Sequence, residues 1–140
     1  MATWLVVEDE DDIRNIVKVM FGAWGHTAIE FRNGNEAFEW LDKVEAGTFS
    51  GELPELALMD IRMPGPRGNE IARRMRSLSQ FEHTPILLMT AFSLTEGERK
   101  AMFDDDGVDF IIHKPLPDFF ELKKKLDEVA AEKSTNSKSG

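Results

Sequence analysis

The sequence predicts an α/β fold, in which five buried parallel strands alternate with five helices in a single domain. Short apolar runs alternate along the chain with longer segments whose apolar residues recur every three or four positions. The chain has 140 residues and is 41% hydrophobic, which suffices for one domain with its own core. Strict alternation of strands and helices implies right-handed crossovers and a doubly wound, three-layer sandwich.

The first strand is predicted at residues 4–7, Trp-Leu-Val-Val. The helix after it can be capped by Asp11 or Asp12, and it ends at Gly25, a residue suited to a helix C-terminus. Apolar residues three and four positions apart give this helix one buried face: Ile13, Ile16, Val17, Met20, Phe21 and Trp24.

The second strand is predicted at residues 27–31, and the Asn33-Gly34 pair that follows is typical of a turn. Asn35 can cap a second helix, which leads into a loop containing Gly and Pro at residues 47–54.

The third strand is predicted at residues 56–60 and runs into a rigid loop rich in Pro and Gly at 63–68. The helix that follows carries Ile71, Ala72 and Met75 at helical spacing.

The fourth strand is predicted at residues 86–90, directly after Pro85. Thr95 is a suitable cap for the fourth helix, because Glu98 three residues later completes a capping box, and Gly107 ends this helix.

The fifth strand is predicted at residues 110–113, and Asp118 caps the last helix. Residues 132–140 contain no apolar side chain, so we expect a disordered polar tail there and a folded domain over residues 1–131.

Charge and composition exclude several classes of function. The net charge of −9 argues against direct binding to nucleic acid, whose phosphates this chain would repel. The sequence has no cysteine, so disulfides and thiolate metal sites are ruled out. No apolar run is long enough to cross a membrane and no signal peptide is evident, so a cytoplasmic protein is expected.

Polar side chains follow four of the predicted strands, at the point where each strand ends. Glu8 and Asp9 follow the first strand, and Asp60, Thr90 and Lys114 end or follow the third, fourth and fifth. The carboxyl ends of parallel strands share one edge of the sheet, where open α/β proteins bind ligands. The sequence therefore predicts one small pocket with three carboxylates, a hydroxyl and an ammonium group.

These groups suit a divalent metal and a phosphoryl group. Carboxylate oxygens are ligands for Mg²⁺, or alternatively Mn²⁺, and the mutual repulsion of Glu8, Asp9 and Asp60 would favour a bound cation. Asp60 is the best candidate nucleophile because it stands alone before a tight loop that should leave its oxygen accessible. Thr90 offers a hydroxyl to a phosphoryl oxygen, and Lys114 offers a positive charge.

The chain resembles the receiver domain of two-component response regulators over about residues 3–130. The motifs that carry the resemblance are Val7-Glu8-Asp9-Glu10, Met59-Asp60-Ile61-Arg62-Met63-Pro64-Gly65, Met89-Thr90-Ala91 and His113-Lys114-Pro115.

The resemblance implies a flavodoxin-like sheet of strand order 2-1-3-4-5 and transfer of a phosphoryl group from a sensor histidine kinase, or a phosphotransfer protein, to this chain. It also implies a cis peptide bond between Lys114 and Pro115. The implied roles are Asp60 as phospho-acceptor, Thr90 and Lys114 as contacts to the phosphoryl oxygens, and Glu8, Asp9, Asp60 and the backbone carbonyl of Arg62 as Mg²⁺ ligands.

The chain departs from the family pattern at two places. Glu8 stands where many receivers carry Asp. The aromatic residue that commonly lies three residues before the lysine is replaced by Ile111, while Phe110 lies four residues before it. Either an insertion shifts the aromatic, or Ile111 replaces it and Phe110 is a core residue.

Three functions compete. The first is a phospho-acceptor that signals to a downstream protein by protein–protein contact, as a monomer or homodimer, with no output domain, no membrane attachment and no turnover of an external substrate. The second is a Mg²⁺-dependent phosphohydrolase, which the Arg62 side chain argues against because such enzymes carry an acid two residues after the nucleophile. The third is a degenerate receiver, which the complete set of pocket residues argues against.

Overall fold

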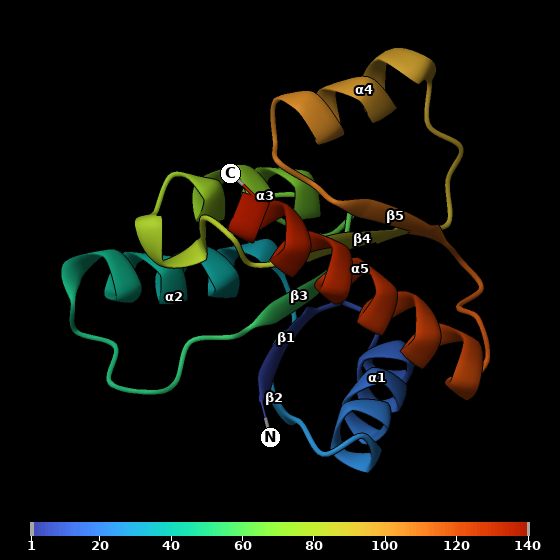
Figure 1. The fold of residues 1–140 in the computed structure, drawn as a ribbon, viewed down its shortest axis with the longest axis horizontal. Helices are drawn as coiled ribbons and strands as arrows, with labels where there is room; N and C mark the ends of the chain where they lie inside the picture. The colour runs from blue at the N-terminus through green and yellow to red at the C-terminus, as the bar shows by residue number, and fades with distance from the viewer. Residues whose placement is uncertain (1, 140) are drawn as a thin grey trace.

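The computed structural model describes residues 2–139 and contains one five-stranded parallel sheet of order β2-β1-β3-β4-β5. Helices cover both faces of this sheet, and the chain crosses from one face to the other as the resemblance implies (Figure 1). The strands are β1 Thr3–Val7, β2 Thr27–Phe31, β3 Leu56–Asp60, β4 Ile86–Thr90 and β5 Phe110–His113. The helices are α1 Asp11–Ala23, α2 Gly34–Ala46, α3 Gly68–Arg76, α4 Glu96–Asp104 and α5 Phe119–Ser139, with a 3₁₀ turn at Ser79–Phe81.

Two apolar clusters hold the three layers together, one on each face of the sheet. Because side chains alternate along a strand, Leu5 and Val7 of β1 pack toward α2 and α3, whereas Trp4 and Val6 pack toward α1 and α5. The three central strands β1, β3 and β4 are buried at every position, as expected for strands covered on both faces. The predicted doubly wound fold and its strand order are confirmed.

Two of the four predicted helix caps are correct and two are wrong. Thr95 caps α4 with Glu98 completing the box, and the Asp118 carboxylate accepts from the Glu121 amide at 2.9 Å. Helix α1 instead begins after Glu10, with no side-chain cap, and the Asp11 carboxylate accepts a hydrogen bond from Arg14 in the first turn. Helix α2 is capped by a different residue, Asn33, whose side chain accepts from the Glu36 amide at 2.9 Å, so Asn35 lies inside the helix.

The predicted polar tail differs from the structure, in which α5 continues to Ser139. The extension has a physical reason, because the Lys133 ammonium lies 3.1 Å from the Asp109 carboxylate and ties this part of α5 to the start of β5. The Thr135 hydroxyl also donates to the Ala131 carbonyl one turn earlier, at 3.0 Å. Gly140, the last residue of the predicted tail, lies outside the described residues.

Between residues 2 and 139, the structure contains no helix with the length and hydrophobicity needed to span a membrane.

The backbone at the end of β3 lies so close to the first residue of α3 that only glycine fits there. A Cβ atom at Gly68 would lie 2.2 Å from the backbone oxygen of Asp60, so the backbone at the end of β3 would have to move. We expect Gly68→Ala to lower the free energy of unfolding by about 1–3 kcal/mol, the usual cost of overpacking.

The matched control is Gly22→Ala in α1, where a Cβ would meet no atom within 4 Å. It should raise the free energy of unfolding by about 0.5–1 kcal/mol, because alanine favours the helix over glycine. Urea unfolding measures both variants, and equal effects at the two positions would contradict the close approach at Gly68.

Candidate functional site

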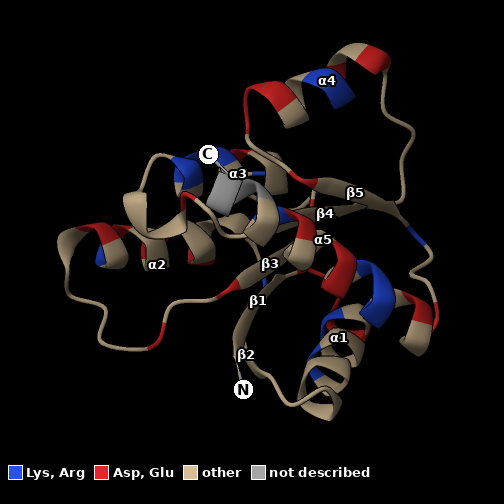
Figure 2. Cartoon of the chain, in the orientation of Figure 1, with Lys and Arg blue, Asp and Glu red and all other residues tan. Residues whose placement is uncertain are grey.

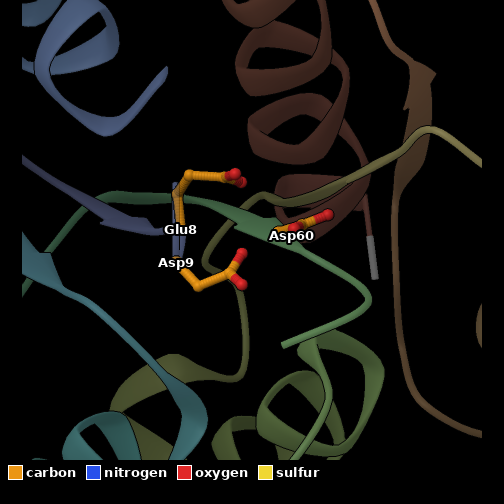
Figure 3. Close-up of side chains that lie close together, drawn as sticks. All are labelled: Glu8, Asp9 and Asp60. Carbon is orange, nitrogen blue, oxygen red and sulfur yellow. The ribbon is translucent and has the colours of Figure 1, made fainter. Parts of the chain in front are cut away.

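Three carboxylates from the ends of two strands lie together at the carboxyl edge of the sheet. Glu8 and Asp9 follow β1, Asp60 ends β3, and one oxygen of each lies within 4.8 Å of the others. Figure 3 shows that the Glu8 and Asp9 side chains both extend in the direction of Asp60. Glu8 and Asp60 are buried and Asp9 is exposed, so the group is open to solvent at one carboxylate.

Lys114, directly after β5, brings a positive charge into this group. Its ammonium lies 2.9 Å and 3.2 Å from the two carboxylate oxygens of Glu8 and 3.5 Å from Oδ2 of Asp60. The lysine side chain is only 10% exposed, so these pairs are shielded from water. The peptide bond between Lys114 and Pro115 is cis, as the resemblance implies.

Burial is the largest influence on the pKa values of the two buried carboxyl groups. It raises the pKa of Glu8 to about 7, although the hydrogen bond from Lys114 opposes the change, and it also raises the pKa of Asp60. Burial alone would lower the pKa of Lys114, but the Glu8 and Asp60 carboxylates outweigh it and raise that pKa. The site therefore has more negative charge than one lysine can neutralise, and a divalent cation bound by carboxylate oxygens would relieve this.

The sequence analysis predicts an accessible oxygen on Asp60, and the structure differs. Asp60 is only 5% exposed, and Lys114 lies 3.5 Å from its carboxylate. The exposed carboxylate is that of Asp9.

Thr90 ends β4 beside the end of β3, since Asp60 is paired with Met89 in the sheet register. Its side chain is buried, at 1% exposure for the residue. The hydroxyl oxygen accepts from the Phe92 amide at 3.0 Å and lies 3.3 Å from the Phe92 carbonyl, to which it can donate. The hydroxyl is thus partnered within its own loop rather than with the carboxylates.

Arg62 lies two residues beyond Asp60, and its guanidinium carbon lies 4.2 Å from the centre of the Phe92 ring. Its exposed side chain is therefore engaged with the loop after β4. The Arg62 carbonyl, which the resemblance implies as a metal ligand, stays a prediction.

Arg14 supports the site and was missed by the sequence analysis. Its guanidinium is buried and donates to the Glu8 carbonyl at 2.9 Å, while it also bonds the Asp11 and Glu30 carboxylates at 2.6 Å and 3.1 Å. These bonds fix the turn from β1 into α1 that presents Glu8 and Asp9. The sequence pattern could have indicated its burial, because Arg14 lies three positions before Val17 and therefore on the buried face of α1.

The side chains at positions 110 and 111, before Lys114, pack into different apolar clusters. Ile111 is 3% exposed and lies in the same apolar cluster as Met75 and Met102. Phe110 packs against the opposite cluster, with the Lys125 ammonium 4.7 Å from its ring centre. Phe110 is thus a core-packed residue, and an aliphatic side chain occupies the position three residues before Lys114.

Acidic side chains are spread over most of the helices rather than confined to the site (Figure 2). The charge of the pocket is therefore a local feature that comes from strand ends, and the net charge of −9 is a property of the whole surface.

The sequence matches the model of one protein family. A model of the response regulator receiver domain matches residues 4–127. Regulatory protein VanRB of Enterococcus faecalis is 34% identical over 127 residues, which cover 91% of this chain and 50% of VanRB. The chain thus spans half the length of that relative, and the match concerns only this half.

Solved structures agree on the fold. Chemotaxis response regulator CheY4 of Vibrio cholerae superposes with a TM-score of 0.74 at 27% identity, covering 92% of this chain and 98% of that chain. The receiver domain of the sensor histidine kinase PA1611 from Pseudomonas aeruginosa gives a TM-score of 0.74 at 22% identity, covering 93% and 98%. That structure contains a magnesium ion coordinated in its active site cleft.

Proposed function

The chain belongs to the response regulator receiver family, and on this premise we propose that it is a Mg²⁺-dependent phospho-acceptor whose Asp60 takes a phosphoryl group. As a receiver domain it is a signalling module rather than an enzyme that turns over an external substrate. The observation that carries the proposal is the meeting of Glu8, Asp9, Asp60 and Lys114 from three strand ends.

The donor set fits the proposed metal. The three carboxylates offer hard oxygen ligands within 4.8 Å of one another, and Asp9 leaves the group open to solvent. Glu8, Asp9 and Asp60, with the Arg62 carbonyl, would hold Mg²⁺, and Mn²⁺ could take the same place. When bound, the metal supplies positive charge that offsets the charge of the phosphoryl oxygens.

The remaining steps belong to the chain's own residues. A carboxylate oxygen of Asp60 attacks the phosphorus atom, a new P–O bond forms, and the bond to the donor breaks with its electron pair leaving on the donor. Lys114 exchanges part of its contact with Glu8 and Asp60 for a phosphoryl oxygen, and the Thr90 hydroxyl donates to another. Hydrolysis of the acyl phosphate by water would reset the protein.

We also propose the partners that this chemistry requires. The donor would be the phosphohistidine of a sensor kinase or of a phosphotransfer protein, and the output would be contact with a downstream protein. Either a monomer or a homodimer is compatible with this function.

Asp9→Asn should weaken Mg²⁺ binding about tenfold or more, because Asp9 is the exposed ligand that a hydrated cation meets first and its negative charge is lost. Isothermal titration calorimetry at pH 8 measures the affinity. Asp12→Asn is the matched control, since it removes the same charge from an exposed residue in the first turn of α1. Equal affinity in the two variants would place the ion elsewhere.

A further inference from the structure

The two loops beside the proposed phosphorylation site are joined by one stacked pair. Arg62 follows Asp60 by two residues, and Phe92 follows Thr90 by two residues. The guanidinium carbon lies 4.2 Å from the ring centre, a geometry in which a cation is attracted to the ring face. Phe92 is 49% exposed, so Arg62 covers part of an aromatic ring that the core leaves open.

The backbone of Phe92 is tied to the hydroxyl that the proposed reaction needs. The Thr90 oxygen accepts from the Phe92 amide at 3.0 Å and can donate its single hydrogen to the Phe92 carbonyl at 3.3 Å. To donate to a phosphoryl oxygen instead, Thr90 must give up the Phe92 carbonyl. Movement of Thr90 and movement of Phe92 are therefore coupled, and stacking on Arg62 opposes both.

We propose that Arg62 and Phe92 form a latch that holds Thr90 in its own loop until a phosphoryl group on Asp60 competes for the hydroxyl. This rests on the proposed function in one respect, namely that the competing acceptor is a phosphoryl group. Arg62 is then a positioning residue, which acts on Thr90 through Phe92. When the latch opens, the Phe92 ring leaves the guanidinium.

Phe92 is an aromatic side chain placed to report on Thr90, which the side chains at positions 110 and 111 of β5 are not. Ile111 is aliphatic and buried, and Phe110 packs beside Lys125, and no hydrogen bond joins either side chain to Thr90 among the contacts of the described residues. Phe92 is aromatic, half-exposed and bonded directly to Thr90. Its release would change the surface between the ends of β3 and β4.

The first test needs no phosphoryl donor. Arg62→Met removes the cation but leaves Phe92 unchanged, so hydrogen exchange of the Phe92 amide should become about two- to fivefold faster, the effect of one exposed cation–π pair. Residue-resolved NMR measures this rate. The matched control is Arg99→Met, which removes the same charge from another arginine stacked on a phenylalanine, 5.3 Å from the Phe103 ring centre.

Coupling is tested in a second background. In Phe92→Leu protein there is no ring to stack on, so adding Arg62→Met should leave the exchange of the amide at position 92 unchanged. A merely structural effect of Arg62 would persist in that background, and it would overturn the latch. Equal exchange of the Phe92 amide in Arg62→Met and Arg99→Met would overturn it as well.

The second test uses a small acyl phosphate with Mg²⁺. Phe92→Leu frees Thr90 without changing the charge near the donor, so labelling of Asp60 should be about two- to fivefold faster than in the wild type. Phe120→Leu, at a phenylalanine that is 77% exposed on α5, should not change the rate. An unchanged or slower rate in Phe92→Leu overturns the role of the latch in the reaction. Faster amide exchange in Arg62→Met, with no labelling of the wild type, would support the latch and refute the proposed function.

Discussion

We expect Asp60→Asn protein incubated with Mg²⁺ and a small acyl phosphate to gain no phosphoryl group, whereas the wild type should gain one. The amide of asparagine has no charged oxygen to attack phosphorus, so the effect is the loss of labelling rather than a reduced rate. Intact-protein mass spectrometry measures the gain, and alkaline hydroxylamine should remove it because the product is an acyl phosphate.

The control for this substitution is Asp42→Asn. Asp42 is an exposed acid on α2 that pairs with Arg74 at 2.8 Å, far from the chemistry in sequence and on a different element. It should be labelled like the wild type. Equal labelling of Asp60→Asn would show that another residue accepts the phosphoryl group, and the proposed role of Asp60 would then be wrong.

Folding of the Asp60→Asn variant is not expected to suffer. Asp60 is one of three neighbouring carboxylates, and burial raises its pKa, so the neutral amide removes a like charge from a crowded site. A loss of labelling in a variant that unfolds at the same urea concentration as the wild type, or higher, would therefore report on chemistry alone.

The strands and the pocket could be predicted from the sequence for one physical reason. Buried parallel strands are short apolar runs, so the sequence shows where each strand ends. Because the strands are parallel, the residues that follow them all lie at the same edge of the sheet. Glu8, Asp60, Thr90 and Lys114 are all found this way, and the structure brings the first two together with Lys114. No knowledge of side-chain geometry is needed for that step.

Contacts between side chains could not be predicted in the same way. The Arg14 guanidinium contacts Asp11 on its own helix, but Glu30 of β2 becomes its neighbour only after the sheet and α1 have packed together. The predicted capping residues of α1 and α2 were wrong for a related reason. Acidic residues and asparagines occur in runs near α1 and α2, and the residue that caps is decided by which backbone amides its side chain can reach.

The pairing of Lys114 with Glu8, rather than chiefly with Asp60, is the feature of the site with the largest expected effect on stability. The ammonium is 2.9 Å from Glu8 and 3.5 Å from Asp60, and all three side chains are at most 10% exposed. Lys114→Met removes the cation at similar volume, so the Glu8 and Asp60 carboxyls lose the ammonium that pairs with both. At pH 8 without divalent metal we expect the free energy of unfolding to fall by about 3–5 kcal/mol, as found when one member of a buried pair is removed.

This loss should depend on pH in a fixed direction. The pKa of Glu8 is raised by burial to about 7 in the folded protein, above its ordinary value of 4.5, so the folded state binds a proton more tightly than the unfolded state. Its contribution to stability is complete below pH 4.5 and is lost as the pH rises through 7. Removing Lys114 raises that pKa further, so the destabilisation grows with pH and should be about 1 kcal/mol or less at pH 5, where Glu8 is already protonated.

Urea unfolding at pH 5 and pH 8 in the presence of a chelator tests this dependence. Lys100→Met, which removes an exposed lysine paired with Asp104 on α4, should leave the urea midpoint of unfolding nearly unchanged at both pH values, because water screens that pair. Adding Mg²⁺ should restore much of the stability that Lys114→Met loses. Mg²⁺ should also bind this variant more tightly than the wild type, because the ion no longer competes with the ammonium for the same carboxylates. A loss of equal size at pH 5 and pH 8, unaffected by Mg²⁺, would mean that Lys114 stabilises the protein through packing of its alkyl chain and that its charge has no part in the site.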